Sequence, residues 1–123
     1  MGAEVEELGS MENRKYTRVP SRMRCWCEGE NVTLYSRVGN LSEGGLFLRT
    51  ATPLPEGVQA TVRLGVGEED VPEVQTLVKV VWSRNNDNKW PSGMGLRFES
   101  LDAVSLERIR QIISYEQARW PGA

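Results

Sequence analysis

Short stretches in which apolar and polar residues alternate make up most of this sequence. Alternation with a period of two is typical of a β-strand that buries one of its faces. Six such stretches are separated by turn-forming residues, and they cover residues 21–29, 31–40, 45–50, 58–66, 74–84 and 93–100. Short strands at this regular spacing predict an antiparallel barrel or sandwich, in which no long strand edge is left unpaired.

Two of these stretches indicate which side chains share a face. In residues 21–29, the apolar residues Met23, Cys25 and Cys27 alternate with Arg22, Arg24 and Trp26. In residues 74–84, Leu77, Lys79 and Val81 should face opposite to Val78, Val80 and Trp82. Both patterns predict strands with one buried face and one face toward solvent.

The spacing of apolar residues changes after residue 100. The residues that follow a helical stripe are Leu106, Ile109, Ile112 and Ile113. We therefore expect one amphipathic helix of about four turns over residues 102–119, with Asp102 as its N-terminal cap and Pro121-Gly122 closing its end. Packing of this helix on the barrel is favoured over binding of a partner, because a small barrel needs a cover for one open side.

Composition is that of one ordinary soluble domain, since 39% of the 123 residues are hydrophobic and 26% are charged. We expect residues 1–12 to form a flexible acidic leader and residues 13–120 to form a single domain. No stretch approaches the roughly 18 apolar residues of a membrane span, and the N-terminus lacks the pattern of a secretory signal. The sequence therefore predicts a cytoplasmic protein without membrane insertion.

The residue types of this chain do not favour a metal site or a catalytic site. The two cysteines, Cys25 and Cys27, flank Trp26, and at this spacing in a strand they are too far apart for a good disulfide. The chain has no histidine, so the usual closed zinc sites cannot be assembled. No cysteine has a base at hand, and no nucleophile is evident. We expect two small buried thiols, no metal site, no cofactor and no catalytic residues, which means that the protein is not an enzyme.

Charge is distributed unevenly along the chain, although its net value is only −2. Residues 1–12 carry four glutamates and no cation, whereas residues 13–24 carry no acid and hold Arg14, Lys15, Arg18, Arg22 and Arg24. Because the whole molecule is slightly acidic, a polymer of nucleic acid or an anionic membrane is disfavoured as a partner. The basic segment suits a compact anion such as a small phosphate ligand, and its alternative interpretation is a solvated strand and linker.

A second polar segment, residues 39–47, interrupts the barrel pattern. If it stays extended, Asn40 and Ser42 project to one side while Leu41 points to the core. An amide and a hydroxyl would then share a surface on which they could bind a base edge and a phosphate oxygen. Gly44 and Gly45 would allow a ligand to approach the backbone closely. The alternative is a turn with a side-chain bond to its own backbone and a β-bulge.

These two segments carry a family resemblance. Arg14-x-x-x-Arg18, followed after about two strands by Asn40-x-Ser42-x-x-Gly45, resembles the paired "RxxxR" and "[D/N]xSxxG" signature of PilZ domains. The later "GMGLRF" (residues 93–98) strengthens the resemblance, which covers roughly residues 12–115. It implies a bacterial six-stranded antiparallel β-barrel with an N-terminal arm and a C-terminal helix packed on the barrel. It also implies a receptor for cyclic di-guanylate (c-di-GMP), which carries two guanines and two phosphates.

The resemblance implies a role for each motif residue. Arg14 and Arg18, about 13 Å apart in an extended arm, would hold phosphate and guanine. Asn40 and Ser42 would bind the ligand from the barrel surface. Gly45, which has no side chain, would keep that surface from protruding toward the ligand. Because a residue before proline favours extended backbone, residues 13–20 would form a mobile arm that joins the barrel at a stiff point and orders on binding.

Further expectations concern the edge of the site and the partners. Additional ligand contacts are expected among Lys15, Gly44, Trp82 and Met94, of which Trp82 and Met94 are equally explained by barrel packing. Asn13 stands where many relatives that bind two stacked ligands have another arginine, which favours one c-di-GMP per domain but leaves the number open. The receptor, a monomer or weak dimer, would relay binding to an unidentified protein effector. The alternative is a protein-interaction adaptor that does not bind c-di-GMP.

Overall fold

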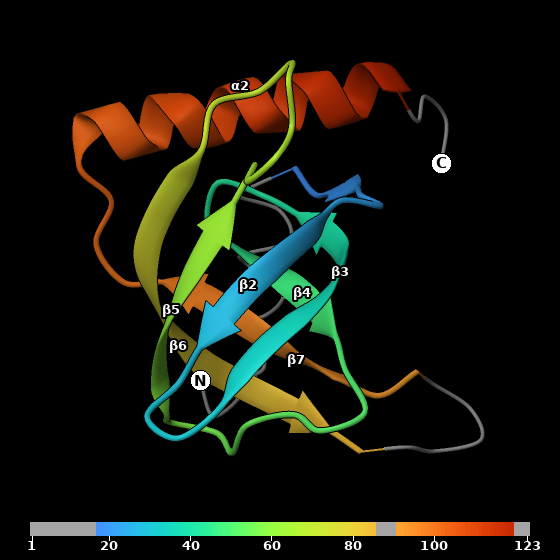
Figure 1. Ribbon diagram of the computed structural model, residues 1–123, viewed down its shortest axis with the longest axis vertical. Helices are drawn as coiled ribbons and strands as arrows, with labels where there is room; N and C mark the ends of the chain where they lie inside the picture. Colours follow the sequence, from blue (N-terminus) through green and yellow to red (C-terminus); the bar gives the residue numbers. More distant parts are fainter. Residues whose placement is uncertain (1–16, 86–90, 120–123) are drawn as a thin grey trace, which may run out of the picture.

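The computed structural model describes residues 17–85 and 91–119. Its elements are β1 (Val19–Pro20), β2 (Arg24–Glu28), β3 (Thr33–Leu41), β4 (Gly45–Arg49), β5 (Gln59–Leu64), β6 (Val74–Arg84), β7 (Gly93–Phe98) and α2 (Ala103–Arg119). Within the described ranges, the antiparallel pairings run β3–β2–β5–β6–β7–β4 and return from β4 to β3, which closes the barrel (Figure 1). The six-stranded barrel with a C-terminal helix is therefore confirmed.

The short strand β1 lies outside this ring. It pairs with β3, with Val19 opposite Leu41 and Pro20 opposite Asn40. Val19 is buried in the core. The last residues of the predicted arm are thus already part of the sheet, whereas the flexibility expected for the leader and for the first residues of the arm concerns residues outside the described ranges.

The barrel interior is filled by the apolar residues that alternate along each strand. Its largest fully buried apolar side chains include Val38, Leu41, Leu46, Leu48, Val62, Leu64, Val78, Val80 and Met94. Cys25 and Cys27 belong to the same core and are both free thiols, as predicted. Burial raises the pKa of Cys25 to about 12 and that of Cys27 to about 11, so both stay protonated and unreactive near neutral pH.

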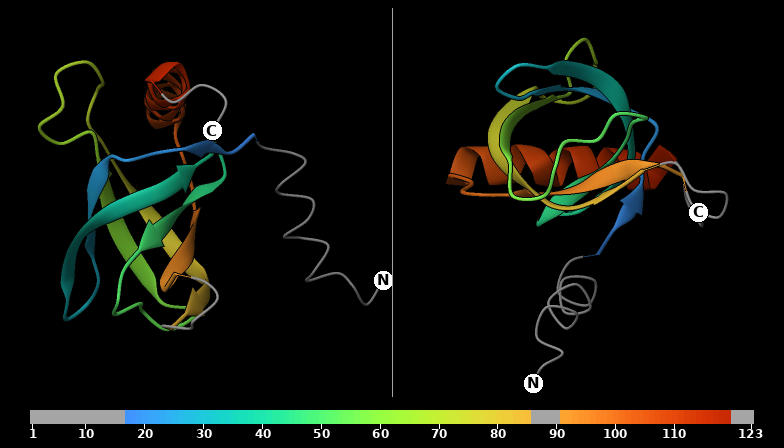
Figure 2. Two further views of the ribbon diagram at one scale, coloured as in Figure 1. Left: turned by 90° about the vertical axis from the view of Figure 1, so that its right-hand side faces the viewer. Right: turned by 90° about the horizontal axis from the view of Figure 1, so that it is seen from below.

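Helix α2 lies across one open end of the barrel (Figures 1 and 2). Its fully buried Ile109 and Ile112 complete the core there. Asp102 caps the helix as predicted, because its carboxylate accepts a 2.7 Å hydrogen bond from the Ser105 N–H. The same bond lowers the pKa of Asp102 below its usual range. The predicted stop at Pro121 and Gly122 lies outside the described residues.

Among residues 17–85 and 91–119, no helix has both the length and the apolar character needed to cross a membrane.

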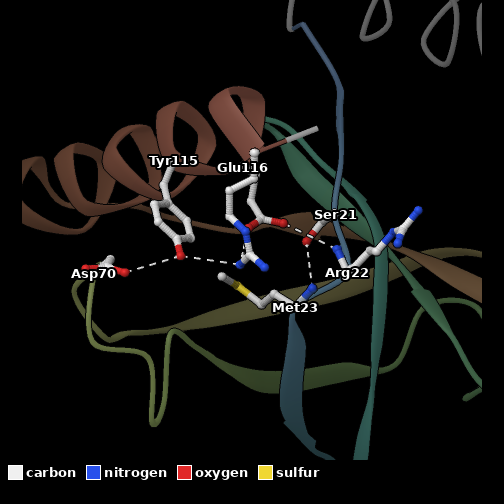
Figure 3. A network of polar contacts seen from close by, with 7 residues as sticks. Ser21, Arg22, Met23, Asp70, Tyr115 and Glu116 are labelled. Atoms are coloured by element: carbon white, nitrogen blue, oxygen red, sulfur yellow. Dashed lines mark hydrogen bonds and ion pairs between the residues drawn. The ribbon is translucent and has the colours of Figure 1, made fainter. Parts of the chain in front are cut away.

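A buried carboxylate fastens the C-terminal end of α2 to the segment between β1 and β2 (Figure 3). Glu116 is 0% exposed, and its Oε1 accepts a hydrogen bond of 3.3 Å from the backbone N–H of Arg22. Its Oε2 lies 3.9 Å from the Arg119 guanidinium. Beside it, the Ser21 hydroxyl accepts a hydrogen bond from the Met23 N–H. The helix therefore contacts the point at which the arm enters the barrel.

Replacing Glu116 by alanine should lower the free energy of unfolding by about 1 to 3 kcal/mol, because the backbone N–H of Arg22 loses its acceptor in a partly buried place. Urea denaturation followed by tryptophan fluorescence measures the change. Glu116→Gln is the matched control, since its amide oxygen can still accept from Arg22. Equal losses for the two variants would contradict the assigned role of the acceptor.

Candidate functional site

The structure brings together one residue from each predicted motif. Because β1 pairs with β3, the residue just before β1, Arg18, lies beside the end of β3. The Arg18 Nη1 donates a hydrogen bond of 2.9 Å to the Oδ1 of Asn40, at an exposed position. The guanidinium has further N–H donors and the Asn40 amide nitrogen has two, so this pair can offer several donors to an anion or a base edge.

The other arm residues of the site lie outside the described residues. Arg14 and Lys15 belong to residues 1–16, so the expected grip of two guanidiniums about 13 Å apart stays a prediction.

Ser42 has a different environment from the one expected. It is only 2% exposed, and its hydroxyl accepts a hydrogen bond of 3.1 Å from the Gly44 N–H and donates one of 3.4 Å to the Gly45 carbonyl. The Ser42 N–H also donates to the Gly45 carbonyl. Ser42 therefore shapes the turn between β3 and β4, and the expectation that it shares an open surface with Asn40 is wrong, because its side chain is buried. Leu41 does point to the core, as predicted.

Gly45 is required by the contact between two strands. It begins β4 opposite Arg97 of β7, and a Cβ atom at residue 45 would lie 1.9 Å from the carbonyl oxygen of Leu96. Its neighbour Gly44 accepts a hydrogen bond from the Phe98 N–H through its carbonyl oxygen. The absence of a side chain at Gly45 lets β4 and β7 approach and close the barrel.

Trp82 lies on the opposite face of β6 from the one predicted. A register shift between Val80 and Trp82 places one extra residue in β6, so that Trp82 comes opposite Gly95 rather than opposite an inward-facing residue. Such a β-bulge reverses the alternation of faces beyond it. The prediction that Trp82 shares a face with Val78 and Val80 is therefore wrong, and its indole is directed to the outer surface.

On that surface Trp82 and Phe47 form an aromatic pair. Their ring centroids are 5.4 Å apart and their planes differ by 18°. The pair depends on two glycines, because a Cβ at Gly95 would lie 2.2 Å from the indole and one at Gly39 would lie 2.6 Å from the Phe47 ring. Phe47 is also the cross-strand neighbour of Asn40. The aromatic pair thus lies next to the polar pair of Arg18 and Asn40.

Arg84 adds a cation to the same surface. Its guanidinium carbon lies 4.9 Å from the centroid of the Trp82 ring and 5.7 Å from that of Phe47. The sequence reasoning missed Phe47, Arg84, Gly39 and Gly95. The alternating glycines in "GMGLRF" were a usable signal, because Gly93 and Gly95 fall on one face of a strand and leave room there for rings from neighbouring strands.

Met94 is a core residue and not a surface contact. It is 0% exposed, lies opposite Leu48, and its sulfur accepts a hydrogen bond of 3.3 Å from the Leu54 N–H. The prediction of an additional ligand contact is wrong for Met94, because in β7 it points inward between Gly93 and Gly95.

An ion pair joins the β3–β4 turn to α2. The two nitrogens Nε and Nη2 of Arg110 lie 3.2 and 3.4 Å from the two carboxylate oxygens of Glu43. The hydrogen bond to this carboxylate raises the pKa of Arg110 above its ordinary value. Helix α2 therefore contacts two segments next to the site, the β3–β4 turn through Arg110 and the segment between β1 and β2 through Glu116.

Together these side chains suit a ligand with flat rings and anionic groups. Arg18, Asn40 and Arg84 supply donors, while Phe47 and Trp82 supply apolar ring surface. In the described part of the chain, no group of three or more His, Cys, Asp or Glu side chains could hold a metal ion.

Fold and site together define a class of protein, namely a small closed β-barrel, capped at one end by a helix, with a polar and aromatic surface where an N-terminal arginine meets the third strand. The PilZ domain family model matches residues 12–115. The chain belongs to the PilZ domain family, and the resemblance carried by its motifs is confirmed. No protein with a curated description matches the sequence.

Solved structures share this fold at low sequence identity. The PilZ domain of YcgR from Escherichia coli, solved with c-di-GMP, has a TM-score of 0.69 and 20% identity, and the match covers 86% of this chain and 92% of that one. The inhibitor of motility MotI/DgrA from Bacillus subtilis has a TM-score of 0.70 and 17% identity, over 86% of this chain and 51% of that one. This chain thus spans about half the length of the Bacillus protein.

Proposed function

We propose that this protein is a receptor for c-di-GMP, which binds on the outer barrel surface between the N-terminal arm and the end of β3. The observation that carries the proposal is the 2.9 Å hydrogen bond from Arg18 to Asn40, which joins the two motifs. Family membership and the similar fold of the YcgR domain solved with c-di-GMP support it.

The chemistry of the surface fits this dinucleotide. Arg18 and, from the arm, Arg14 bond to phosphate oxygens and to guanine O6 and N7, for which the planar guanidinium fork is well suited. Asn40 bonds to a guanine edge from the barrel. Trp82 and Phe47 offer ring surface to a purine, and Arg84 lies over both rings.

The remaining motif residues act mainly by holding the site in shape. Ser42 and Gly45 fix the turn that follows the strand of Asn40, through the hydroxyl bonds of Ser42 and the close strand contact at Gly45. Lys15 and the backbone at Gly44 are further contacts in the proposal. None of these contacts needs a catalytic group, so in this proposal the protein acts by binding c-di-GMP and not by catalysing a reaction.

The attachment of α2 to the barrel supports a relay to a protein effector. Ordering of the arm on c-di-GMP changes the segment at Arg22 whose N–H contacts Glu116. Movement of the β3–β4 turn is passed to the same helix through the ion pair of Glu43 and Arg110. We propose that α2 and its surroundings present the ligand-dependent surface to the effector.

Titration of the purified full chain with c-di-GMP in a calorimeter tests the proposed function. We expect saturable heat with a dissociation constant below about 1 mM, whereas GMP, which lacks the second guanine and the diester ring, should bind much more weakly. A folded sample that gives no saturable signal up to that concentration would refute the receptor proposal.

The same titration addresses the alternative of an adaptor that does not use the ligand. One observation favours this second candidate: Ser42 and Gly45 have roles in the turn and the barrel that need no ligand. Their presence would then be explained by folding alone. A silent titration of a folded sample would leave this candidate as the proposed function.

A further inference from the structure

Three arginines form a continuous row on the outer surface of the barrel. Arg24 of β2 lies directly opposite Arg37 of β3, and Arg37 lies directly opposite Arg49 of β4. All three are exposed. Neighbouring strands are about 4.8 Å apart, so the row places three positive charges side by side across three strands.

Within residues 17–85 and 91–119, no acidic side chain forms an ion pair with a member of the row. In the described part of the chain, the ion pairs made by arginines involve Arg63, Arg97, Arg110 and Arg119, and none involves a member of the row. On the same face of β2 the acid is Glu28, four residues from Arg24, which in a strand is about 13 Å. Like charges directly opposite in a sheet are destabilising. Within the described barrel, no ion pair offsets this repulsion.

Aromatic side chains border the row on one side. Trp26 lies opposite Tyr35, and their ring centroids are 4.6 Å apart with the planes tilted by 38°. Tyr35 is 52% exposed, and the Arg24 guanidinium lies 5.7 Å from the centroid of its ring. Arg, Tyr and Trp are the residue types that dominate binding energy at protein interfaces.

We propose that this face, formed by Arg24, Arg37 and Arg49 with Trp26 and Tyr35, docks an acidic segment of a partner protein. Charge complementarity selects the partner, since three cations in a row that form no ion pair within the described residues match carboxylates spaced along an extended chain. A nucleic acid fits less well, because the protein has a net charge of −2 and the two rings pack against each other instead of standing apart to receive bases.

This surface borders the proposed c-di-GMP site without sharing a residue with it, because Arg49 lies two residues from Phe47 on the same face of β4. None of its five side chains contributes to the pairs formed by Arg18 with Asn40 or by Phe47 with Trp82. The docking proposal goes beyond the receptor function. Its test does not require c-di-GMP, so its outcome is independent of the receptor proposal.

The test uses the full chain and a fluorescent synthetic peptide of twelve residues in which glutamate alternates with leucine, followed by fluorescence anisotropy at low salt. We expect saturable binding, and we expect the triple variant Arg24→Gln, Arg37→Gln, Arg49→Gln to bind at least about tenfold more weakly. Tyr35→Ala, which keeps every charge, should bind severalfold more weakly. Thermal unfolding checks that each variant is folded, and the single variant Arg37→Gln replaces the triple variant if that one does not fold.

A charge-matched control lies on another part of the surface. Lys79 and Arg97 are opposite each other on β6 and β7, and Arg108 is exposed on α2. The triple variant Lys79→Gln, Arg97→Gln, Arg108→Gln removes the same charge and should bind the peptide as the unchanged protein does.

Four outcomes would overturn the docking proposal. The first is an equal loss of binding in the control variant, because attraction would then be nonspecific. The second is unchanged binding by the row variants. The third is tighter binding of a single-stranded oligonucleotide of twelve nucleotides than of the peptide. The fourth is peptide binding only after Glu4, Glu6, Glu7 and Glu12 are replaced by glutamine, which would make the acidic leader of this chain the occupant.

Discussion

Replacing Arg18 by alanine is expected to weaken the binding of c-di-GMP by about 2 to 5 kcal/mol, or roughly 30-fold to several thousandfold in dissociation constant. The guanidinium is lost together with its bond to Asn40, so both the charge and the arrangement of the amide change. The free energy of unfolding should stay nearly unchanged, because Arg18 is exposed while the adjacent Val19 keeps β1 in the core. Calorimetry measures the first quantity and urea denaturation the second.

Two further variants separate charge from geometry at this position. Arg18→Lys keeps the positive charge but loses the planar fork, so its affinity should lie between those of the unchanged protein and Arg18→Ala. Arg108→Ala on α2 removes an exposed arginine away from the site and should leave affinity unchanged. If Arg18→Ala instead unfolds the barrel, or binds c-di-GMP normally when folded, Arg18 is a structural residue and its role as a ligand contact is wrong.

The positions of the strands and the helix could be predicted from the sequence, because burial of one face gives apolar residues a regular spacing in each kind of element. The alternation of Met23, Cys25 and Cys27 with polar neighbours, and the stripe containing Ile109 and Ile112, each correspond to buried faces in the structure. The bulge in β6 could not be predicted from the spacing of apolar residues. It depends on the pairing of β6 with β7, which is a contact between separate segments, and it moves Trp82 to the other face without any change in local pattern.

In the candidate site, too, the sequence predicted some features and not others. The meeting of Arg18 and Asn40 agrees with the order and spacing of the two motifs, and it required only that the arm pair with β3. The burial of Ser42 and the tight contact at Gly45 depend on how closely the β3–β4 turn and β7 approach. A resemblance identifies such residues without telling whether they contact a ligand or hold the strands together.

Replacing Gly45 by alanine is expected to destabilise the barrel by about 3 kcal/mol or more, before any effect on the ligand is considered. The added Cβ would lie 1.9 Å from the Leu96 carbonyl oxygen, which is part of the backbone of β7 and cannot rotate away. Either β4 or β7 must move, and the hydrogen bonds that close the barrel would weaken. Urea denaturation should reveal a lower midpoint with an unchanged slope.

Gly29→Ala is the matched control for this effect. A Cβ at Gly29 would meet the Val32 side chain at 3.4 Å, which a small shift accommodates, so stability should change by less than about 0.5 kcal/mol. If Gly45→Ala is as stable as Gly29→Ala and still fails to bind c-di-GMP, Gly45 acts at the ligand surface and not between the strands. If it loses stability and yet binds c-di-GMP with full affinity below its unfolding temperature, the glycine of this motif serves the fold alone, and specificity for the dinucleotide must come from Arg18, Asn40 and the aromatic pair.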